Sequence, residues 1–406
     1  MTPPILLQAH PEFRAYLPGS DTCPLLLTPQ QSIGGHLSTQ ATHFMVHEVP
    51  LYLPSQSGEH LFALMLKNNL STTEAIKILA DEHGIKSKDI SFAGRKDKYA
   101  LTTQWISTQQ VTSLHSEHEN VQILYQAHHT NKLKLGHLCA NLFSIYLSDI
   151  QYPQRLDHSL SLLSQGVPNY FGRQRFGRVW YESKRTDEDE ILYNDQGHKI
   201  QDPTNWASDN VDRALQVLKQ NEKNKKGRGN KTNKKLLLSA LQSALFNLWL
   251  GERIRDGLLH QVILGDVCRK KTGGTFYSTD PQEDTRRLQA GEIEILGPLF
   301  GPKIFPSHAH AAEREQELYK RWGMEESLMK SMAKFWKGDR RSATLSPIAL
   351  RANLVSLMTT PTQTKSSYGV WLHFMLPKGA YATTICTELL QTGHPFIRQD
   401  VSSHSI

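Results

Sequence analysis

The sequence predicts an α+β protein with more than one domain. Between residues 43 and 107, segments typical of strands and one amphipathic helical segment follow each other in the order strand, strand, helix, hairpin. After residue 345 a strand followed by a helix returns. The chain has 406 residues, which is long for a single hydrophobic core, so two domains are expected.

The first strands and the first helix are predicted from the alternation of apolar residues and from a helix-capping pattern. Residues 1–40 are rich in Pro and Gln and show little periodicity, which predicts a loosely packed lead-in. Segments 43–49 and 59–66 are predicted strands, the first because its apolar residues alternate. Ser71, followed three residues later by Glu74, forms a capping-box pattern and predicts the start of a helix.

A hairpin is predicted after this helix, and its turn carries one carboxylate. Segments 90–93 and 99–107 are rich in β-branched and aromatic residues and flank a polar turn that begins at Gly94. Asp97 lies in the turn, where its sequence neighbours are cationic: Arg95, Lys96 and Lys98. Because nearby positive charge lowers the pKa of a carboxyl group, an ionised Asp97 is expected. Such a loop tip can present a reactive group, but an aspartate there can also simply form the turn.

Later segments continue the same mixture of strands and helices. The sequence alternates from residue 142 to 147, which predicts a strand. Residues 236–255 have the apolar spacing of a buried helix, and Gly257 is expected to end it. Near the C-terminus, residues 370–376 predict a strand and residues 382–389 a helix.

Two stretches resemble the TruD family of tRNA pseudouridine synthases. The segment from Phe92 to Gln104, FAGRKDKYALTTQ, is similar to the active-site segment of that family, and GVPNYFGRQRFG at residues 166–177 is similar to its second signature. The resemblance implies that Asp97 is the catalytic nucleophile. It also implies a pseudouridine synthase catalytic domain with a mixed, largely antiparallel sheet, built from residues 1–165 and 346–406, with an inserted α+β TRUD domain at residues 166–345.

The resemblance also implies a set of substrate-binding residues. Phe44 would pack against the substrate base, and Asn141 would contact the substrate. Phe143 matches the family's Asn-x-Phe element, although a phenylalanine here is also a normal core residue of a strand. Tyr381 stands where the family has a substrate-contacting phenylalanine. Ser38 stands where relatives usually carry a cation, so Arg95 or Lys96 is expected to balance the charge of the nucleophile.

The charge of the chain favours a polyanionic partner. The formal net charge is +7, and nucleic-acid affinity is dominated by Lys and Arg contacts to phosphate. Candidate RNA contacts are the cations in the two signatures: Arg95, Lys96, Lys98, Arg173 and Arg175. Residues 219–235 are strongly basic and are either an RNA-contacting arm or an exposed linker.

Several other classes of protein are not indicated. The four cysteines have no metal-ligand or disulfide spacing, and His308 and His310 lack further nearby ligands, so no metal site is expected. No signal peptide or membrane-spanning run is found in the sequence, and a cytoplasmic monomer is expected. Pseudouridine formation needs neither a redox partner nor hydrolysis, so no cofactor is expected either.

The family implies isomerisation of uridine 13 in the D-arm of tRNA. Asp97 could attack C1′ of the ribose, add to C6 of the ring, or remove the ribose 2′ proton, and all three routes require its ionised form. The target base must be flipped out of folded RNA. The alternative function is a tRNA-binding chaperone that keeps the scaffold without turnover.

Overall fold

The protein is described from a computed structural model that defines residues 24–172, 176, 183–185, 190–192, 214, 231–321, 333, 337–357 and 367–391. These residues divide into two compact units. The sheet unit takes the described residues of Pro29–Gln165, Ser346–Ala382 and Leu389–Ile406, and the second unit takes those of Met1–Thr28, Gly166–Leu345 and Thr383–Glu388. Each unit is described by itself.

A nine-stranded sheet is the centre of the sheet unit. Its main order is β16-β17-β7-β2-β5-β3-β6, and two short strands pair with it, β1 with β7 and β4 with β5. The strands are β1 (His36–Leu37), β2 (Phe44–Pro50), β3 (His60–Asn68), β4 (Ser91–Phe92), β5 (Leu101–Thr108), β6 (Val121–His129), β7 (Leu138–Ser148), β16 (Ile348–Leu357) and β17 (Ser367–Pro377). The prediction of a strand was therefore confirmed at segments 43–49, 59–66, 142–147 and 370–376.

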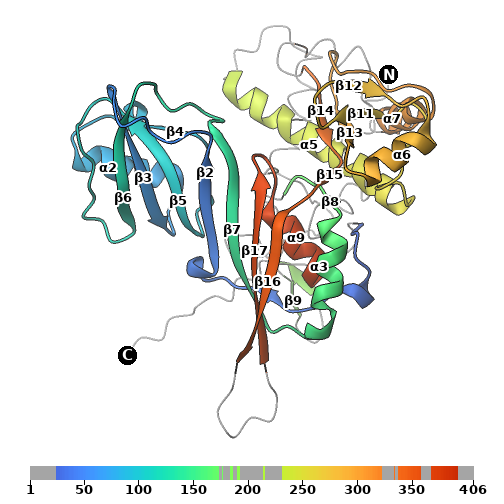
Figure 1. Cartoon of the computed structure of the whole chain (residues 1–406), viewed down its shortest axis with the longest axis horizontal. Coiled ribbons are helices and arrows are strands. Elements are labelled where there is room, and N and C mark those ends of the chain that lie inside the picture. The colour runs from blue at the N-terminus through green and yellow to red at the C-terminus, as the bar shows by residue number, and fades with distance from the viewer. Residues whose placement is uncertain are drawn as a thin grey trace, which may run out of the picture. The chain divides into compact units, whose positions relative to one another are not determined.

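Both ends of the chain contribute to this sheet. Strands β16 and β17 pair with each other, and β17 pairs with β7 over eight residues from Val370 to Pro377. Figure 1 shows these late strands, in orange and red, beside the green β7. Strands β2 and β5 run parallel, while the other paired strands run antiparallel. The predicted mixed, largely antiparallel sheet is confirmed.

Helix α2 (Thr72–Glu82) covers one face of the sheet. Its N-cap is Ser71, whose side chain accepts from the backbone of Glu74 while the Glu74 carboxylate accepts from the backbone of Ser71, which confirms the predicted capping box. Apolar residues of α2, such as Leu79, pack with Leu61 and Met65 of β3 in one core cluster. Because side chains alternate along a strand, the intervening Phe62 points to the opposite face.

That opposite face has its own smaller core. Phe62 and Trp105 pack with Ala93, Leu133 and Leu138, and the partly buried Tyr52 and Leu64 lie against them. Ala93 lies directly after β4, whereas Leu133 and Leu138 belong to the connection between β6 and β7 and to the start of β7. This core therefore joins the base of the predicted hairpin to the β6–β7 connection.

The lead-in is more tightly packed than the sequence suggested. Ile33 and Leu37 are buried, and the carbonyl of Ile33 accepts from the backbone amides of Gln151 and Tyr152. The prediction of a loosely packed segment is wrong for residues 29–40, because isolated apolar side chains without periodicity can still fill gaps at the edge of a sheet. Residues 1–23 lie outside the described chain.

The second unit contains a four-stranded antiparallel sheet and the longest described helix. Sheet order is β12-β11-β13-β14. The elements are β8 (Val167–Pro168), β9 (Ser183–Arg185), β10 (Glu190–Leu192), α5 (Lys231–Arg255), β11 (Val267–Lys270), β12 (Thr275–Tyr277), α6 (Pro281–Gln289), β13 (Ile293–Leu299), α7 (Ala309–Arg321), β14 (Asp339–Ser342) and β15 (Thr344–Leu345). Helix α5 confirms the helix predicted over residues 236–255.

Two further helices complete the description. Helix α3 (Leu156–Ser164) belongs to the sheet unit, and α9 (Ala382–Leu390), which confirms the predicted C-terminal helix, contains residues of both units. Among the described helices, none has the length and apolarity needed to cross a membrane.

Candidate active site

The predicted hairpin exists, and Asp97 lies in the loop that joins its strands. Strands β4 and β5 pair with Ser91 opposite Ser107, and residues 93–100 form the connection. Tyr99 was expected in the second strand but lies in this loop and is exposed. The long connection needs anchors, because an isolated loop of this length would not hold one conformation.

The first anchor is the side chain of Thr72 at the start of α2. Its hydroxyl accepts from the backbone amide of Lys96 at 2.9 Å and donates to Gln104 Oε1 at 2.8 Å. The Gln104 amide in turn donates to the carbonyl of Gly94 at 3.3 Å. A threonine of the helix and a glutamine of β5 therefore hold the loop on both sides of Arg95.

The second anchor is a buried ion pair formed by Lys96. Its ammonium lies 2.6 Å from Glu48 Oε2 and donates to Asn141 Oδ1 at 2.7 Å. Side-chain exposure is 4% for Lys96 and 0% for Glu48. Glu48 and Asn141 are direct cross-strand partners on β2 and β7, and Glu48 Oε1 also accepts from the Trp105 amide. Burial raises the pKa of Glu48, while Lys96 and the Trp105 hydrogen bond lower it.

The third anchor holds Asp97 itself. Lys67, at the end of β3, donates from its ammonium to the backbone carbonyl of Asp97 at 2.6 Å. The Lys67 side chain is completely buried, and burial lowers its pKa to about 8 although the charge of Asp97 acts to raise it. Two lysines, Lys67 and Lys96, therefore provide the positive field at Asp97.

Two opposing effects act on the pKa of the Asp97 carboxyl group. Desolvation by the surrounding protein raises its pKa, and the charges of Lys67 and Lys96 lower it, with a net shift upward. The expectation of a net downward shift is therefore wrong, because the sequence does not show the density of protein around the loop. Asp97 nevertheless keeps an exposed surface, so the upward shift does not mean a side chain sealed from water.

The other two cations of the loop do not pair with Asp97. Lys98 forms a surface ion pair with Glu74 of α2 at 2.8 Å, and Arg95 is exposed. Lys96 was expected to contact RNA, but its buried ammonium is engaged by Glu48 and Asn141. Among these three cations, the structure leaves Arg95 and Lys98 on the surface, where a phosphate could reach them.

The two predicted aromatic contacts lie in the core of the sheet. Phe44 is 8% exposed and Phe143 is 5% exposed, and their rings meet edge to face with centroids 6.3 Å apart. Phe143 also stacks on Phe374 of β17 at 5.4 Å. The packing is that of core strand residues, which is the alternative open for Phe143 from the sequence.

The remaining residues predicted for the site are Tyr381 and Ser38, which lies in the segment before Phe44. Tyr381 is half-buried and lies directly before α9. The hydroxyl of Ser38 bonds to His43 Nδ1 at 2.6 Å, and burial lowers the pKa of His43, so this pair places no fixed positive charge there. The contacts described above join Asp97 with Lys67 and Lys96, and Lys96 with Asn141.

The chain is similar to known proteins over most of its length. The sequence profile of the family described as tRNA pseudouridine synthase D (TruD) matches residues 23–194 and 209–389, which include every residue of the candidate site. The chain belongs to the TruD family. A tRNA pseudouridine synthase D of Thermus thermophilus is 34% identical over 91% of this chain and 92% of its own length. One from an Anaeromyxobacter species is 32% identical over 91% and 96%.

The fold of the chain is also that of a solved TruD structure. The crystal structure of a protein assigned as tRNA pseudouridine synthase D from Methanosarcina mazei matches with a TM-score of 0.62 at 23% identity, covering 89% of this chain and 94% of that one. This likeness concerns the fold alone. It confirms the predicted fold class, because the match covers 89% of this chain.

The second TruD signature contributes mainly to packing in the described residues. Tyr170, Phe171 and Phe176 are buried. The Arg341 guanidinium lies 3.9 Å from the centre of the Phe171 ring and bonds to Asn169. Arg173 and Arg175 lie outside the described residues, as do the side chains of residues 219–234.

Three residues that hold the loop were missed from the sequence. Glu48 follows Phe44 and Val46 at the same inward spacing, and Lys67 follows Ala63 and Met65 in the same way. A charged residue at an inward position of an alternating strand is the available signal, because such a charge must find a partner. Thr72 gave no comparable signal, since a threonine is common at the start of a helix.

Proposed function

We propose that the protein isomerises uridine to pseudouridine in tRNA, with Asp97 as the nucleophile and uridine 13 of the D-arm as the target. The observation that carries this proposal is an accessible carboxylate on a loop fixed by two buried lysines. A nucleophile must be positioned to within a fraction of an ångström, and buried charge pairs resist displacement of the loop. Membership of the TruD family supports the reaction class.

The chemistry conserves atoms and electrons. The bond between N1 of uracil and C1′ of ribose breaks, the base turns, and a bond forms between C5 and C1′. The proton on C5 is released, and N1 gains one. Asp97 can open this sequence at C1′, at C6 or at the ribose 2′ proton, and each route uses the ionised carboxylate. Lys67 and Lys96 favour that form, because their charges lower the pKa of Asp97.

A uridine that flips out of the RNA loses its stacking on neighbouring bases, and contacts with the protein must replace that stabilisation. Stacking on an aromatic ring contributes about 1–3 kcal/mol per base, and unstacking costs a few kcal/mol. Phe44 and Phe143 are packed against each other in the free protein, so we propose that Tyr381, which is half-buried, is the ring closest to being available to the base. Asn141 is held by Lys96 with its amide nitrogen left to donate to the substrate.

Replacing Asp97 with asparagine tests the proposal. Asp97→Asn keeps the size of the side chain and removes its charge, so we expect loss of pseudouridine formation with tRNA affinity changed by no more than a few fold. Release of tritium from C5-labelled uridine measures turnover, and filter binding measures affinity. Wild-type protein that binds tRNA but releases no label would favour the chaperone function instead, and an active Asp97→Asn protein would exclude Asp97 as nucleophile.

A further inference from the structure

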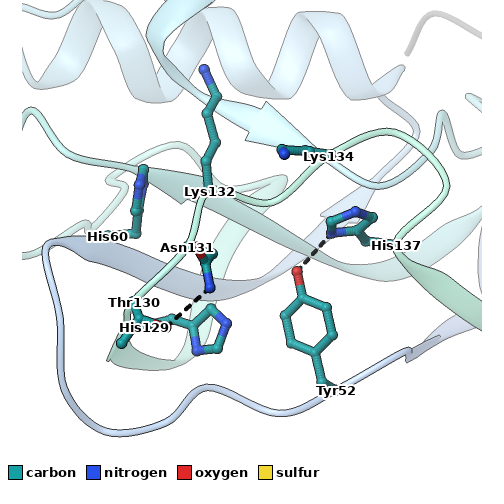
Figure 2. A pocket seen from close by; sticks show the side chains of 8 residues that line it. All are labelled: Tyr52, His60, His129, Thr130, Asn131, Lys132, Lys134 and His137. Atoms are coloured by element: carbon teal, nitrogen blue, oxygen red, sulfur yellow. Dashed lines mark hydrogen bonds between the residues drawn. The ribbon is translucent and has the colours of Figure 1, made fainter.

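A second cationic site lies on the sheet unit, in a pocket of about 500 Å³. We call it the histidine pocket and define it by its lining residues: Tyr52, His60, His129, Thr130, Asn131, Lys132, Lys134 and His137. They come from β3, from the segment before it, from the end of β6 and from the β6–β7 connection. Figure 2 shows their side chains, with Tyr52 and His137 joined by a hydrogen bond.

His129 has a defined hydrogen-bond donor. His129 Nδ1 lies 3.1 Å from the backbone amide of Ser55, which can only donate, so Nδ1 is the acceptor. The neutral ring therefore carries its hydrogen on Nε2. Tyr52 stacks on this ring with centroids 5.0 Å apart and an interplanar angle of 24°, which fixes the orientation of the ring.

His137 is oriented by the same tyrosine. Tyr52 Oη and His137 Nδ1 lie 2.6 Å apart, and which of the two donates depends on the tautomer of the ring. Tyr52 thus contacts two imidazole rings of the pocket, and His129 Nε2–H is a donor that an oxyanion could use.

The electrostatic field of the pocket is positive. Lys132 and Lys134 are exposed. Burial is the main cause that lowers the pKa of His60, and the Lys132 charge and His129 add smaller effects in the same direction. Among the described residues that line the pocket there is no carboxylate. The neighbouring Glu59 acts in the opposite direction on His60, but its carboxylate also accepts from Gln109. An anion in the pocket would relieve the repulsion among these groups.

The pocket is connected to the Asp97 loop through short contacts. The backbone amide of Gly136, next to His137, donates to the carbonyl of Ala93 at 2.7 Å. Ala93 packs in one core cluster with Leu133, which lies between the two pocket lysines. Lys378 donates to the carbonyl of Gly136, which brings a further cation to the same connection. One folded RNA could therefore contact the pocket and Asp97 together.

We propose that the histidine pocket binds a backbone phosphate of the tRNA whose uridine is presented to Asp97. This inference rests on the proposed function for the identity of the RNA. Phosphate oxygens accept from Lys, from His and from amide groups, and the pocket supplies all three kinds of donor. Its volume is large enough for a phosphate with part of its ribose.

The test compares two double variants in the full-length protein. Lys132→Ala/Lys134→Ala removes both pocket lysines, and Lys77→Ala/Lys86→Ala removes two exposed lysines from helix α2 and the turn after it, on the opposite face of the sheet. Equilibrium filter binding of tRNA is measured between about 50 and 200 mM salt. Losing two phosphate contacts should make the slope of log affinity against log salt shallower by about 1.4–1.8 and weaken binding on the order of 30-fold near 0.1 M salt.

The control should keep the wild-type slope. Equal slopes for both double variants would overturn the proposal. Calorimetry with inorganic phosphate separates the two sources of the anion: saturable phosphate binding lost only in Lys132→Ala/Lys134→Ala, with an unchanged tRNA slope, would make the pocket a small-anion site and also overturn it. The binding assay does not depend on turnover. If the wild-type protein forms no pseudouridine but Lys132→Ala/Lys134→Ala still makes the salt slope shallower, the proposed reaction is rejected and the phosphate site is supported.

Discussion

Lys96 and Lys98 are two residues apart on one loop, and each pairs with a glutamate at nearly the same distance. The Lys96–Glu48 separation is 2.6 Å and the Lys98–Glu74 separation is 2.8 Å. Their surroundings differ, because the Lys96 side chain is 4% exposed and that of Lys98 is 43% exposed. Distance alone therefore does not rank the two pairs. Water competes for the charges of the exposed Lys98–Glu74 pair, which we call the outer pair. It is excluded from the buried Lys96–Glu48 pair, which we call the inner pair.

The inner pair gives the loop a conformation that it cannot leave at low cost. Moving Lys96 away would leave the Glu48 carboxylate buried without a counter-ion, and an unpaired buried charge is strongly unfavourable. Lys96 also fixes the side chain of Asn141, a predicted substrate contact. Since a buried ion pair contributes little net stability compared with apolar packing, its value here is the position that it gives to Asp97.

The largest effect is expected when the inner pair is broken from one side. Glu48→Gln keeps the acceptor for the Trp105 amide but removes the charge, which leaves the Lys96 ammonium buried without a counter-ion. We expect the free energy of unfolding to fall by about 3–5 kcal/mol. Denaturation with urea, followed by circular dichroism and fluorescence together, measures the change.

A second variant separates stability from positioning. Glu48→Gln/Lys96→Met removes both charges and should recover most of the lost stability, because no ion is then buried alone. Turnover should stay low in this double variant, since nothing holds Asn141 and the loop. If stability and turnover both return, the inner pair does not position the site.

The fold could be predicted where the sequence pattern is local. The alternation around Val46 and the capping box at Ser71 gave the correct elements. The packing of Ile33 could not be predicted, because its partners near Gln151 are more than a hundred residues away and no periodicity marks them. Which strands pair, and that β2 and β5 run parallel, also depends on long-range contacts.

The candidate site could be predicted only in part, for the same reason. Asp97 was identified from its motif, whereas the cation on its carbonyl, Lys67, comes from a strand thirty residues earlier in the sequence. Sequence proximity pointed instead to Lys98, which turns outward to Glu74. Lys96 is buried and Lys98 is exposed although they are two residues apart in this loop, so adjacency in sequence is a poor guide to which charges meet.

A smaller, more specific effect is expected from removing the charge at Lys67. Its field lowers the pKa of Asp97, so Lys67→Met should raise that pKa. Turnover requires the ionised carboxylate and rises with pH through the Asp97 pKa. The acid limb of the profile of kcat/KM against pH should therefore move to higher pH, by about one unit.

Lys98→Met is the matched control for this experiment, because it removes one charge from the same loop at a position paired with Glu74. Its acid limb should stay where the wild-type limb lies. Equal shifts in both variants would show that the general charge of the loop, rather than the lysine bonded to the Asp97 carbonyl, sets the pKa.

The smallest effect is expected for the stability of Lys98→Met. Both partners of the outer pair are largely exposed, and Glu74 retains its role in capping α2 through the backbone of Ser71 after the lysine is removed. The ion pair and these hydrogen bonds lower the pKa of Glu74 to about 2, with Lys98 as the largest cause, so in the variant this pKa should rise toward its ordinary value. Urea midpoints at low and high salt should match those of the wild type, because screening by salt and water already weakens the pair. A loss of stability as large as that of Glu48→Gln would mean that exposure does not distinguish the two pairs, and the buried position of Lys96 would then no longer explain how the loop is held.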